Sequence, residues 1–438
     1  MKRILLLPSD HGGGRGHVSR CIYLAKKLKA AGAQVALVLE NKHYQNGIEA
    51  GINTFLLDTR KEKFFKFQFK KPFWPRITMI DPPEKAPVFL MFSGLAYQVP
   101  RDQYLSRSIV NRRFKKLNKI VEQFKPDLLI GDTHFLTYLL GKKFSLPVVQ
   151  ITRLAGFPPD PQFFWWMEQP PKMVEPHAVE PFEHLLEKLA ISDVQKAEDL
   201  LRGDLYLIPA SQKIEPLDND KKYVLHCGPL TENSVVDHRI PFFEHPADVP
   251  NIYVTAGGGA NRFGQQQFFE AILNVFDRRD FRVLVSTGGL VPAKSLNGRS
   301  TNVLFVDWVD GLSAIRKSDL VIHHGGYGSM MEVLLTGKPS IVIPFHSEQE
   351  GNGRRLQELQ IGDLVLPFKG KMKELIFSWP FGVYSMMAGF DLNLDAEKII
   401  GMVDQIYEQA LYKRLQKISD ELLDLQQNFS PVDLINRF

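Results

Sequence analysis

Residues 324–352, HGGYGSMMEVLLTGKPSIVIPFHSEQEGN, decide the fold of this chain, because they place a glycine turn and a helix start between two apolar strands. The first strand ends at Ile322, and Gly325 and Gly326 form the turn. A strand that ends in glycine and continues as a helix leaves backbone N–H groups unpaired, and the helix dipole favours an anion beside them. The segment therefore predicts an α/β domain with a phosphate-binding turn.

Polar side chains follow this turn in an order that suits the parts of a nucleotide sugar. His324 and Ser329 can donate hydrogen bonds to a diphosphate, and Ser329 can also cap the new helix. Glu332, further along the helix, can accept hydrogen bonds from ribose hydroxyls. The loop after the second strand adds three more polar side chains that suit the adjacent hydroxyls of a sugar, Glu348, Gln349 and Asn352. Glycine turns alone also occur in α/β proteins that bind no phosphate. The prediction therefore depends on the order and spacing of these polar side chains after the turn.

The segment resembles the donor-binding signature of the UDP-glycosyltransferases of the two-domain GT-B type. That signature runs H-G-G-x-x-S-x-x-E, continues with a strand that ends in I-P, and closes with D/E-Q-x-x-N, and this chain matches every position. The resemblance implies that His324 and Ser329 contact the diphosphate and that Glu332 holds the ribose. It assigns the transferred sugar to Glu348 and Gln349, although many relatives have Asp where this chain has Glu348. It also implies the α/β fold called GT-B, in which two doubly wound parallel-sheet, Rossmann-like domains face a central cleft.

A tryptophan upstream of the turn is the candidate stacking platform for the base. Residues 302–309, NVLFVDWV, look like the strand and aromatic loop that pack on the uracil in this family. Trp308 offers a flat π-face to a planar base, whereas a plain core tryptophan is the alternative. The Pro-Gln that usually follows is replaced by Asp310 and Gly311. This departure bears on the identity of the base rather than on the diphosphate.

Two more strand-to-glycine turns precede Trp308. Residues 251–255 run into a glycine triplet that includes Gly257 and Gly258, and residues 281–286 run into a glycine pair. Both look like the family's loops that approach the diphosphate and the base. Glycine allows close backbone approach but supplies no chemistry. We expect Gly257 and Gly258 to line the donor site.

The amino terminus has the pattern of a βαβ unit with a histidine at its loop–helix junction. An apolar strand from Ile4 to Leu7 leads into a glycine-rich loop, a helix from Val18 to Ala30 and a strand from Gln34 to Leu39. His17 lies where a side chain projects into the crevice at the strand carboxyl ends. An imidazole there can accept a proton from a hydroxyl near neutral pH. A histidine that only caps the helix is the alternative.

The segment GRGHVSRCIYLAKKL is similar to the amino-terminal G-x-G-H motif of the same glycosyltransferases, and the similarity implies that His17 is the general base. Many plant and macrolide relatives have Pro where this chain has Arg20. The form G-H-V-x-R-C looks more like bacterial branches that include nucleotide-sugar hydrolases, which release the sugar to water. Arg20 therefore keeps hydrolysis as the alternative to transfer.

A second apolar strand, residues 125–132, ends in Asp132. Its carboxylate can hold the imidazole of His17 in one tautomer and stabilise the protonated ring, as in other His–Asp pairs. In plant members of the family an Asp at this place has that role. An Asp that caps the following helix is the alternative.

These residues predict inverting transfer of a sugar from a UDP-sugar to an acceptor hydroxyl of a small apolar or lipid-like molecule. His17, aided by Asp132, deprotonates the acceptor, and the turn amides, the helix dipole and His324 stabilise the leaving diphosphate. We expect no metal and no cofactor, because Asp218 to Asp220, the nearest D-x-D, occupies a polar turn with no apolar strand before it. A nucleotide-sugar hydrolase is the alternative function. An epimerase has only the fold in its favour, and the polar residues argue against a non-catalytic protein.

The length of 438 residues fits two cores better than one. We place an amino-terminal acceptor domain at residues 1–235, a linker at about 231–250, and a donor domain at residues 251–438. The helical pattern of residues 395–425 corresponds to the final GT-B helix, which returns to the first domain.

Composition indicates a cytoplasmic protein. Cys21 and Cys227 are far apart and lack metal spacing, which suits a reducing compartment. No signal peptide precedes the first strand, and no apolar run reaches the roughly 20 residues that cross a bilayer. The 54 basic residues exceed the 49 acidic ones by too little to indicate a nucleic-acid surface, so no nucleic acid is expected as a partner.

Three aromatic clusters lie outside these motifs. Residues 60–76, RKEKFFKFQFKKPFWPR, suit a peripheral contact with an anionic membrane at its inner face, or a lipid-linked acceptor. They also suit an ordinary strand or lid with a buried aromatic face, which we favour, and a single-stranded nucleic acid is a third option. Residues 158–176 can form an apolar acceptor wall or pack on the linker, and residues 377–390 can cover the cleft.

Overall fold

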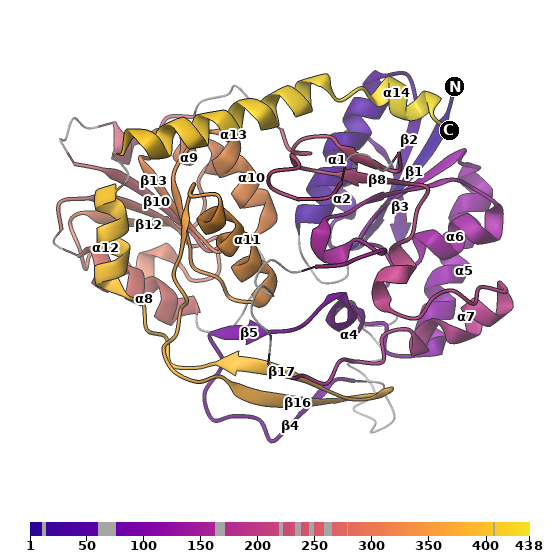
Figure 1. The fold of residues 1–438 in the computed structure, drawn as a ribbon, viewed down its shortest axis with the longest axis horizontal. Coiled ribbons are helices and arrows are strands. Elements are labelled where there is room, and N and C mark those ends of the chain that lie inside the picture. The colour runs from indigo at the N-terminus through magenta and orange to yellow at the C-terminus, as the bar shows by residue number, and fades with distance from the viewer. Residues whose placement is uncertain are drawn as a thin grey trace.

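The computed structural model describes residues 1–10, 15–59, 76–162, 171–218, 222–232, 238–244, 249–257, 265–277, 279–405 and 408–438. Gly258, the lysine-rich residues 60–75 and the aromatic run 163–167 lie outside the described residues. Figure 1 shows two lobes, each built around one parallel sheet. We call them the amino-terminal lobe, with the sheet of residues 3–226, and the carboxyl-terminal lobe, with the sheet of residues 251–364.

The amino-terminal lobe contains a seven-stranded sheet in the order β3-β2-β1-β6-β7-β8-β9, in which all neighbours are parallel. Its strands are β1 (Arg3–Pro8), β2 (Gln34–Glu40), β3 (Asn53–Leu57), β6 (Leu128–Asp132), β7 (Val148–Ile151), β8 (Leu205–Ile208) and β9 (Val224–His226). Its helices are α1 (Arg15–Ala30), α2 (Tyr44–Glu49), α4 (Gln98–Arg101), α5 (Arg107–Phe124), α6 (Thr137–Phe144) and α7 (Glu183–Lys188), with 3-10 turns at η1 (Leu95–Tyr97), η2 (Leu154–Gly156), η4 (Glu180–Phe182) and η5 (Ala197–Leu201). The run Ile4 to Leu7 is apolar at every position because successive side chains enter opposite cores, as parallel strands with two covered faces require.

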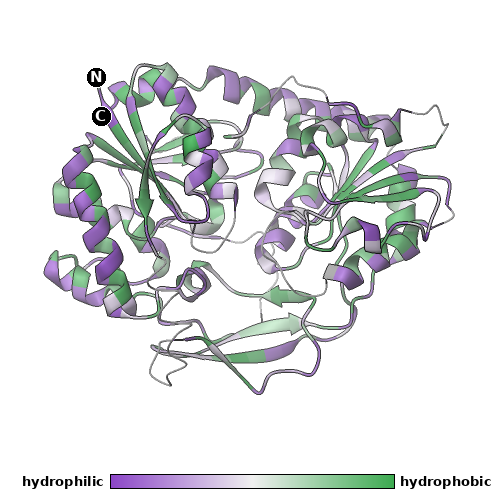
Figure 2. Cartoon of the chain, turned by 180° about the vertical axis from the view of Figure 1, so that it is seen from behind, coloured by the Kyte–Doolittle hydropathy of each residue, from purple (hydrophilic) through white to green (hydrophobic). Residues whose placement is uncertain are grey.

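The carboxyl-terminal lobe repeats this design with six parallel strands in the order β12-β11-β10-β13-β14-β15. The strands are β10 (Asn251–Thr255), β11 (Arg282–Ser286), β12 (Val303–Val306), β13 (Leu320–His323), β14 (Ser340–Val342) and β15 (Asp363–Leu364). The helices are α8 (Gln265–Phe276), α9 (Gly311–Lys317), α10 (Tyr327–Leu335) and α11 (Ser347–Glu358), and 3-10 turns lie at η6 (Pro241–Phe243) and η7 (Ala293–Ser295). Figure 2 shows hydrophobic strands in both lobes between helices with hydrophilic outer surfaces. The predicted pair of doubly wound parallel sheets is confirmed.

Each sheet reverses its strand order at one place, and the predicted site residues lie at these two places. In the amino-terminal lobe β1 is flanked by β2 and β6, and Pro8 is paired with Asp132. In the carboxyl-terminal lobe β10 is flanked by β11 and β13, and Thr255 is paired with His323. Open α/β sheets bind ligands at such reversals, outside the carboxyl ends of the strands. Both halves of the predicted site therefore lie where the topology favours a ligand.

A third sheet, which the sequence analysis did not predict, joins the two halves of the chain. It is antiparallel in the order β4-β16-β17-β5, with β4 (Thr78–Ile80), β5 (Phe89–Met91), β16 (Lys373–Trp379) and β17 (Gly382–Gly389). In Figure 1 it lies beneath both lobes. Leu375, Phe377 and Trp379 alternate with outward-facing residues and pack into the core of the amino-terminal lobe. Residues 373–389, which the sequence analysis placed in the donor domain, are thus part of a sheet shared with the amino-terminal half.

The carboxyl-terminal helices cross from one lobe to the other (Figure 1). They are α12 (Ala396–Gln405), α13 (Gln409–Asn428) and α14 (Pro431–Asn436). Helix α13 packs against α10, and α14 packs against α1, where Leu434 joins the core beneath the first sheet. Lys2 Nζ donates a hydrogen bond to the Phe438 carbonyl at 2.8 Å. The two ends of the described chain therefore lie on the same lobe.

Candidate active site

His17 and Asp132 lie in direct contact. His17 is in the first turn of α1, and Asp132 ends β6 with a fully buried side chain. His17 Nδ1 lies 2.7 Å from Asp132 Oδ1, and 25% of the His17 side chain is exposed. Asp132 does not cap the next helix, whose N-cap is Leu136. Of the two roles considered for Asp132, only the contact with His17 is present.

Arg20, one turn further along α1, holds the same carboxylate with a fork of two hydrogen bonds. Its Nε donates to Asp132 Oδ2 and its Nη2 to Oδ1, both at 2.9 Å. Burial alone would raise the pKa of Asp132, but Arg20 and then His17 lower it to about 2, so the carboxylate is ionised at neutral pH. A proton on His17 Nδ1 would be donated to this anion at 2.7 Å, whereas a bare Nδ1 would accept from Arg20 Nη2 at 2.8 Å, so the neighbours of Nδ1 suit either tautomer. With the proton on Nδ1, Nε2 is the basic nitrogen.

The glycine turn lies between β13 and α10. Gly325 has a φ of +79°, and a Cβ there would lie 2.7 Å from the Gln349 carbonyl oxygen, so only glycine fits. Its N–H donates to Nδ1 of the buried His323 at 3.1 Å and is not available to a ligand. The first-turn amides of α10 have no hydrogen-bond partner among the described residues. The unpaired donors therefore begin after Gly325.

The ring of His324 is enclosed by glycine backbone. A Cβ on Gly257 would lie 2.4 Å from His324 Cε1, and a Cβ on Gly326 would lie 2.2 Å from His324 Nε2. Nδ1 is buried and has no hydrogen-bond partner in the described part of the chain. Burial and then the neighbouring His346 lower the pKa of His324 to about 4. The ring is neutral at pH 7 and offers one N–H donor rather than a positive charge.

Ser329 and Glu332 follow on successive turns of α10. Gly326 is the N-cap and no side chain caps the helix, so Ser329 does not serve as a cap. Its hydroxyl forms no hydrogen bond with the residues that the structure describes, and its side chain is partly exposed. Burial and then Asp310 raise the pKa of Glu332 to about 7. A carboxyl group in this state is poised to ionise when a ligand supplies hydrogen-bond donors.

The raised pKa of Glu332 predicts a stability change with pH. Between about 4.5, the ordinary value, and about 7, the unfolded chain ionises Glu332 while the ligand-free folded protein keeps the proton, so stability falls as pH rises through this window. Glu332→Gln is expected to remove this contribution and to melt at a higher temperature than the wild type at pH 8 but not at pH 4.5. Thermal unfolding at both pH values measures the difference. The exposed Glu397→Gln is the control, and an equal shift in both variants would contradict the assignment.

Trp308 follows β12 and is 59% exposed, so it is not a core side chain. Its indole nitrogen would lie 3.1 Å from a Cβ placed on Gly289, whose φ is +72°. The guanidinium of Arg15, from the start of α1, lies 5.6 Å from the centre of the ring. Trp308 therefore presents an accessible aromatic face where the two lobes meet.

The last three residues of the signature differ in what they can offer a ligand. Gln349 Oε1 accepts from the Phe345 N–H at 2.7 Å, which leaves its amide N–H groups. Asn352 uses both ends of its amide: Nδ2 donates to the Gly325 carbonyl at 2.7 Å, and Oδ1 accepts from Arg153 Nη2 at 2.5 Å. Asn352 was predicted to bind the donor; in the structure its contacts link the backbone of the glycine turn to Arg153 of the amino-terminal lobe. Glu348 Oε1 accepts from Arg153 Nη1 at 3.0 Å.

Comparison with known proteins finds similarity to glycosyltransferases. The Glycosyltransferase family 28 C-terminal domain matches residues 252–371. The chain is 23% identical over 427 residues to an uncharacterized glycosyltransferase of Methanosarcina acetivorans, covering 94% of this chain and 93% of that one. It is 25% identical over 250 residues to NDP-glycosyltransferase YjiC of Bacillus subtilis, covering 56% of this chain and 62% of YjiC. The fold is similar to that of CalG4, the calicheamicin glycosyltransferase, with a TM-score of 0.68, 17% identity, and coverage of 100% and 98%. The chain therefore has the GT-B fold and is similar to glycosyltransferases over nearly its whole length.

Three residues that shape the site of this glycosyltransferase were not predicted from its sequence. His323 binds the Gly325 amide, Arg153 binds Glu348 and Asn352, and Tyr327 lies beneath Arg153. Arg153 carried a usable signal, because it follows the apolar strand β7 at its carboxyl end, as Asp132 follows β6. Tyr327 gave no signal, since it occupies a position that the family signature leaves variable.

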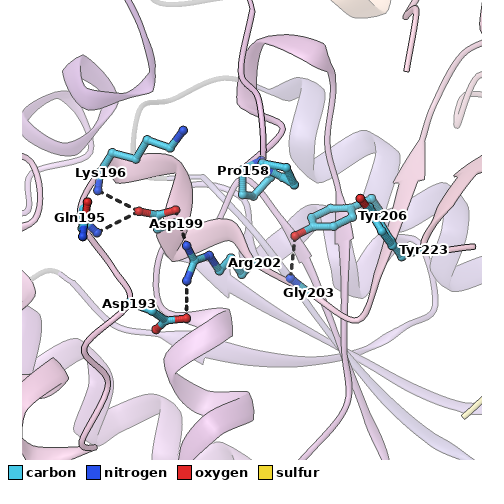
Figure 3. A pocket seen from close by; sticks show the side chains of 10 residues that line it. Pro158, Asp193, Gln195, Lys196, Asp199, Arg202, Gly203, Tyr206 and Tyr223 are labelled. Atoms are coloured by element: carbon cyan, nitrogen blue, oxygen red, sulfur yellow. Dashed lines mark hydrogen bonds and ion pairs between the residues drawn. The ribbon is translucent and has the colours of Figure 1, made fainter. Parts of the chain in front are cut away.

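A large cavity of the glycosyltransferase lies apart from these residues. It has a volume of about 1060 Å³ and is lined by Pro158, Pro159, Asp193, Gln195, Lys196, Asp199, Arg202, Gly203, Tyr206 and Tyr223. Figure 3 shows Arg202 paired with Asp193 and Asp199, and the hydroxyl of Tyr206 directed at the Gly203 amide. The lining combines charged side chains with prolines and tyrosines. The apolar acceptor wall expected at residues 158–176 lies partly outside the described residues and stays a prediction.

No group of three or more His, Cys, Asp or Glu side chains within the described ranges is arranged to hold a metal ion. No helix in the same ranges combines the length and apolar character that crossing a membrane requires.

Proposed function

We propose that this glycosyltransferase moves a sugar from a UDP-sugar to an acceptor hydroxyl with inversion at the anomeric carbon and without a metal. One observation carries the proposal: the His17–Asp132 pair of one lobe lies next to the glycine turn of the other lobe. Arg20, which holds Asp132, lies with its guanidinium 5.8 Å from the centre of the Tyr327 ring, and Tyr327 is the first residue of α10. A nucleophile activated at His17 therefore lies close to a sugar whose diphosphate occupies the start of α10.

Each lobe supplies one part of the proposed chemistry. His17 Nε2 removes the proton from the acceptor hydroxyl, and the ionised Asp132 stabilises the imidazolium that forms. The oxygen then attacks the anomeric carbon from the face opposite the nucleotide, and the bond to the diphosphate breaks. The first-turn amides of α10, its dipole and the neutral His324 stabilise the negative charge that develops on the leaving group.

The donor residues fit the remaining parts of a UDP-sugar. Trp308 provides the exposed face for the base, and Glu332 accepts from the ribose hydroxyls. Glu348 and the free amide of Gln349 bind the transferred sugar. The name NDP-glycosyltransferase refers to nucleoside diphosphates in general, so both uridine and thymidine donors belong in the test.

The second candidate is hydrolysis of a nucleotide sugar, with water in place of the acceptor. It is favoured by Arg20, the residue through which the amino-terminal motif resembles nucleotide-sugar hydrolases, because Arg20 is built into the His17–Asp132 pair. For transfer we propose a small apolar or lipid-like acceptor. Contact of residues 60–76 with the inner face of a membrane stays a prediction.

Incubation of the pure protein with UDP- and dTDP-sugars, with and without small phenols or cell lipids, tests the proposal. Mass spectrometry of the products is expected to show a glycosylated acceptor that forms only when an acceptor is present and that persists in EDTA. Free sugar formed at the same rate without any acceptor would instead support hydrolysis. No product from any donor would refute both functions.

A further inference from the structure

The ring of Tyr327 lies beside two arginines of the other lobe. The guanidinium of Arg153 lies 3.9 Å from the ring centre, and that of Arg20 lies 5.8 Å from it. Tyr327 is only 7% exposed, and its hydroxyl donates to the Pro209 carbonyl at 3.1 Å, after β8. The first side chain of α10 is therefore inserted into the amino-terminal lobe.

Each arginine is in turn bound to groups of the proposed active site. Arg20 holds both oxygens of Asp132, the partner of His17. Arg153 donates from Nε to Glu215 at 2.8 Å, from Nη1 to Glu348 at 3.0 Å and from Nη2 to Asn352 at 2.5 Å. The contacts form one continuous path from the base, through Arg20, Tyr327 and Arg153, to the carboxylate proposed to bind the sugar.

Charge balance keeps both cations beside one ring. Arg20 and Arg153 repel each other, but the buried Asp132 and Glu215 each neutralise one of them. The negative face of an aromatic ring attracts cations most strongly where water is excluded. Removal of the π-face would therefore leave the two guanidinium groups free to shift, each together with the carboxylates that it holds.

We propose that Tyr327 is a positioning residue: through Arg20 and Arg153 it aligns the His17–Asp132 pair of one lobe with Glu348 and Asn352 of the other. This inference rests on the proposed function, since alignment matters only if His17 acts on a group that Glu348 holds. Misplacing reacting groups by about 1 Å can cost on the order of 100-fold in rate without a change in binding elsewhere.

The hydroxyl and the ring of Tyr327 can be tested separately. Tyr327→Phe keeps the π-face and loses only the bond to Pro209, so kcat is expected to stay within about threefold of the wild type. Tyr327→Leu removes the π-face and is expected to lower kcat roughly 30-fold, or about 2 kcal/mol at 1.4 kcal/mol per tenfold change. UDP affinity, measured by calorimetry, is expected to stay within about threefold, because UDP lacks the sugar. Tyr327→Met gives the same readout if the Leu variant does not fold.

A matched control and a double variant exclude a merely structural role. Tyr104 is also buried and carries an arginine, Arg113, at 4.8 Å from its ring centre, but it lies in the core of the amino-terminal lobe. Tyr104→Leu is expected to lower the melting temperature without the loss of kcat. Arg153→Met combined with Tyr327→Leu is expected to lose little more than the worse single variant, because both break the same path.

The outcomes separate the inference from the proposed function. Absence of product from the wild-type protein would refute the function and with it the alignment. Product from the wild type together with unchanged kcat in Tyr327→Leu, or additive losses in the double variant, would overturn the positioning role and leave the function intact.

Discussion

His17→Ala is expected to lower kcat by roughly 1,000-fold, because it removes the only proposed proton acceptor at the acceptor hydroxyl. UDP affinity is expected to change by less than about twofold, since His17 lies on α1 while the proposed diphosphate site lies on α10. Asp132 and Arg20 bind each other through two hydrogen bonds, so the pocket keeps its shape when the imidazole is lost. Steady-state kinetics with the donor found by the substrate panel measures kcat, and calorimetry measures UDP binding.

His177 provides a control for this substitution, because it is an exposed histidine outside the site. His177→Ala is expected to match the wild type in both measurements. An equal loss of turnover and of UDP affinity in His17→Ala would refute the role of His17 as a base and would assign it to donor binding.

Gly326→Ala is expected to weaken UDP binding by roughly 10- to 100-fold. The new Cβ would lie 2.2 Å from His324 Nε2, so either the imidazole or the start of α10 must move. Either movement displaces donors that we propose bind the diphosphate, and a hydrogen bond to a charged group contributes about 1.5–3 kcal/mol, so loss of one costs roughly 10- to 100-fold in affinity. Calorimetry with UDP measures the effect directly, and kcat/KM for the donor is expected to fall in parallel.

Gly401→Ala is the matched control, because a Cβ at this position of α12 meets nothing within 4 Å. Combining Gly326→Ala with His324→Ala provides a further check. If the methyl group acts by displacing the ring, the double variant binds UDP about as well as His324→Ala alone. Unchanged UDP affinity in Gly326→Ala would show that the diphosphate does not lie at this turn.

The central strands and the glycine turns were predictable from sequence because their signals are local. The apolar run Ile4 to Leu7 and the turn after β13 are each contained in a few consecutive residues. The pairing of His17 with Asp132 was also accessible, since both follow strands that lie at the reversal of the sheet. What the sequence could not provide was the geometry by which Arg20 and His17 share one carboxylate.

The remaining features depend on residues that meet only in the folded chain. Strands β4 and β5 have three residues each, too few to show an alternating pattern, and they pair with strands nearly 300 positions later. Tyr327 and Arg153 become neighbours only where the lobes touch. The contacts of Asn352 with Gly325 and Arg153 could not be predicted, because the family signature gives its position but not its partners.

The shared third sheet and α14 delay the completion of the amino-terminal cores until late segments of the chain have been synthesised. Leu375 and Trp379 of β16, and Leu434 of α14, are part of cores that otherwise belong to the first half of the chain. A ribosome that has already produced β1 to β9 must still produce the whole second lobe before those apolar surfaces are covered. A nascent chain that ends before β16 would expose this apolar surface, which favours aggregation and binding by chaperones. Correct folding of the amino-terminal half therefore depends on β16 and α14, which are synthesised late.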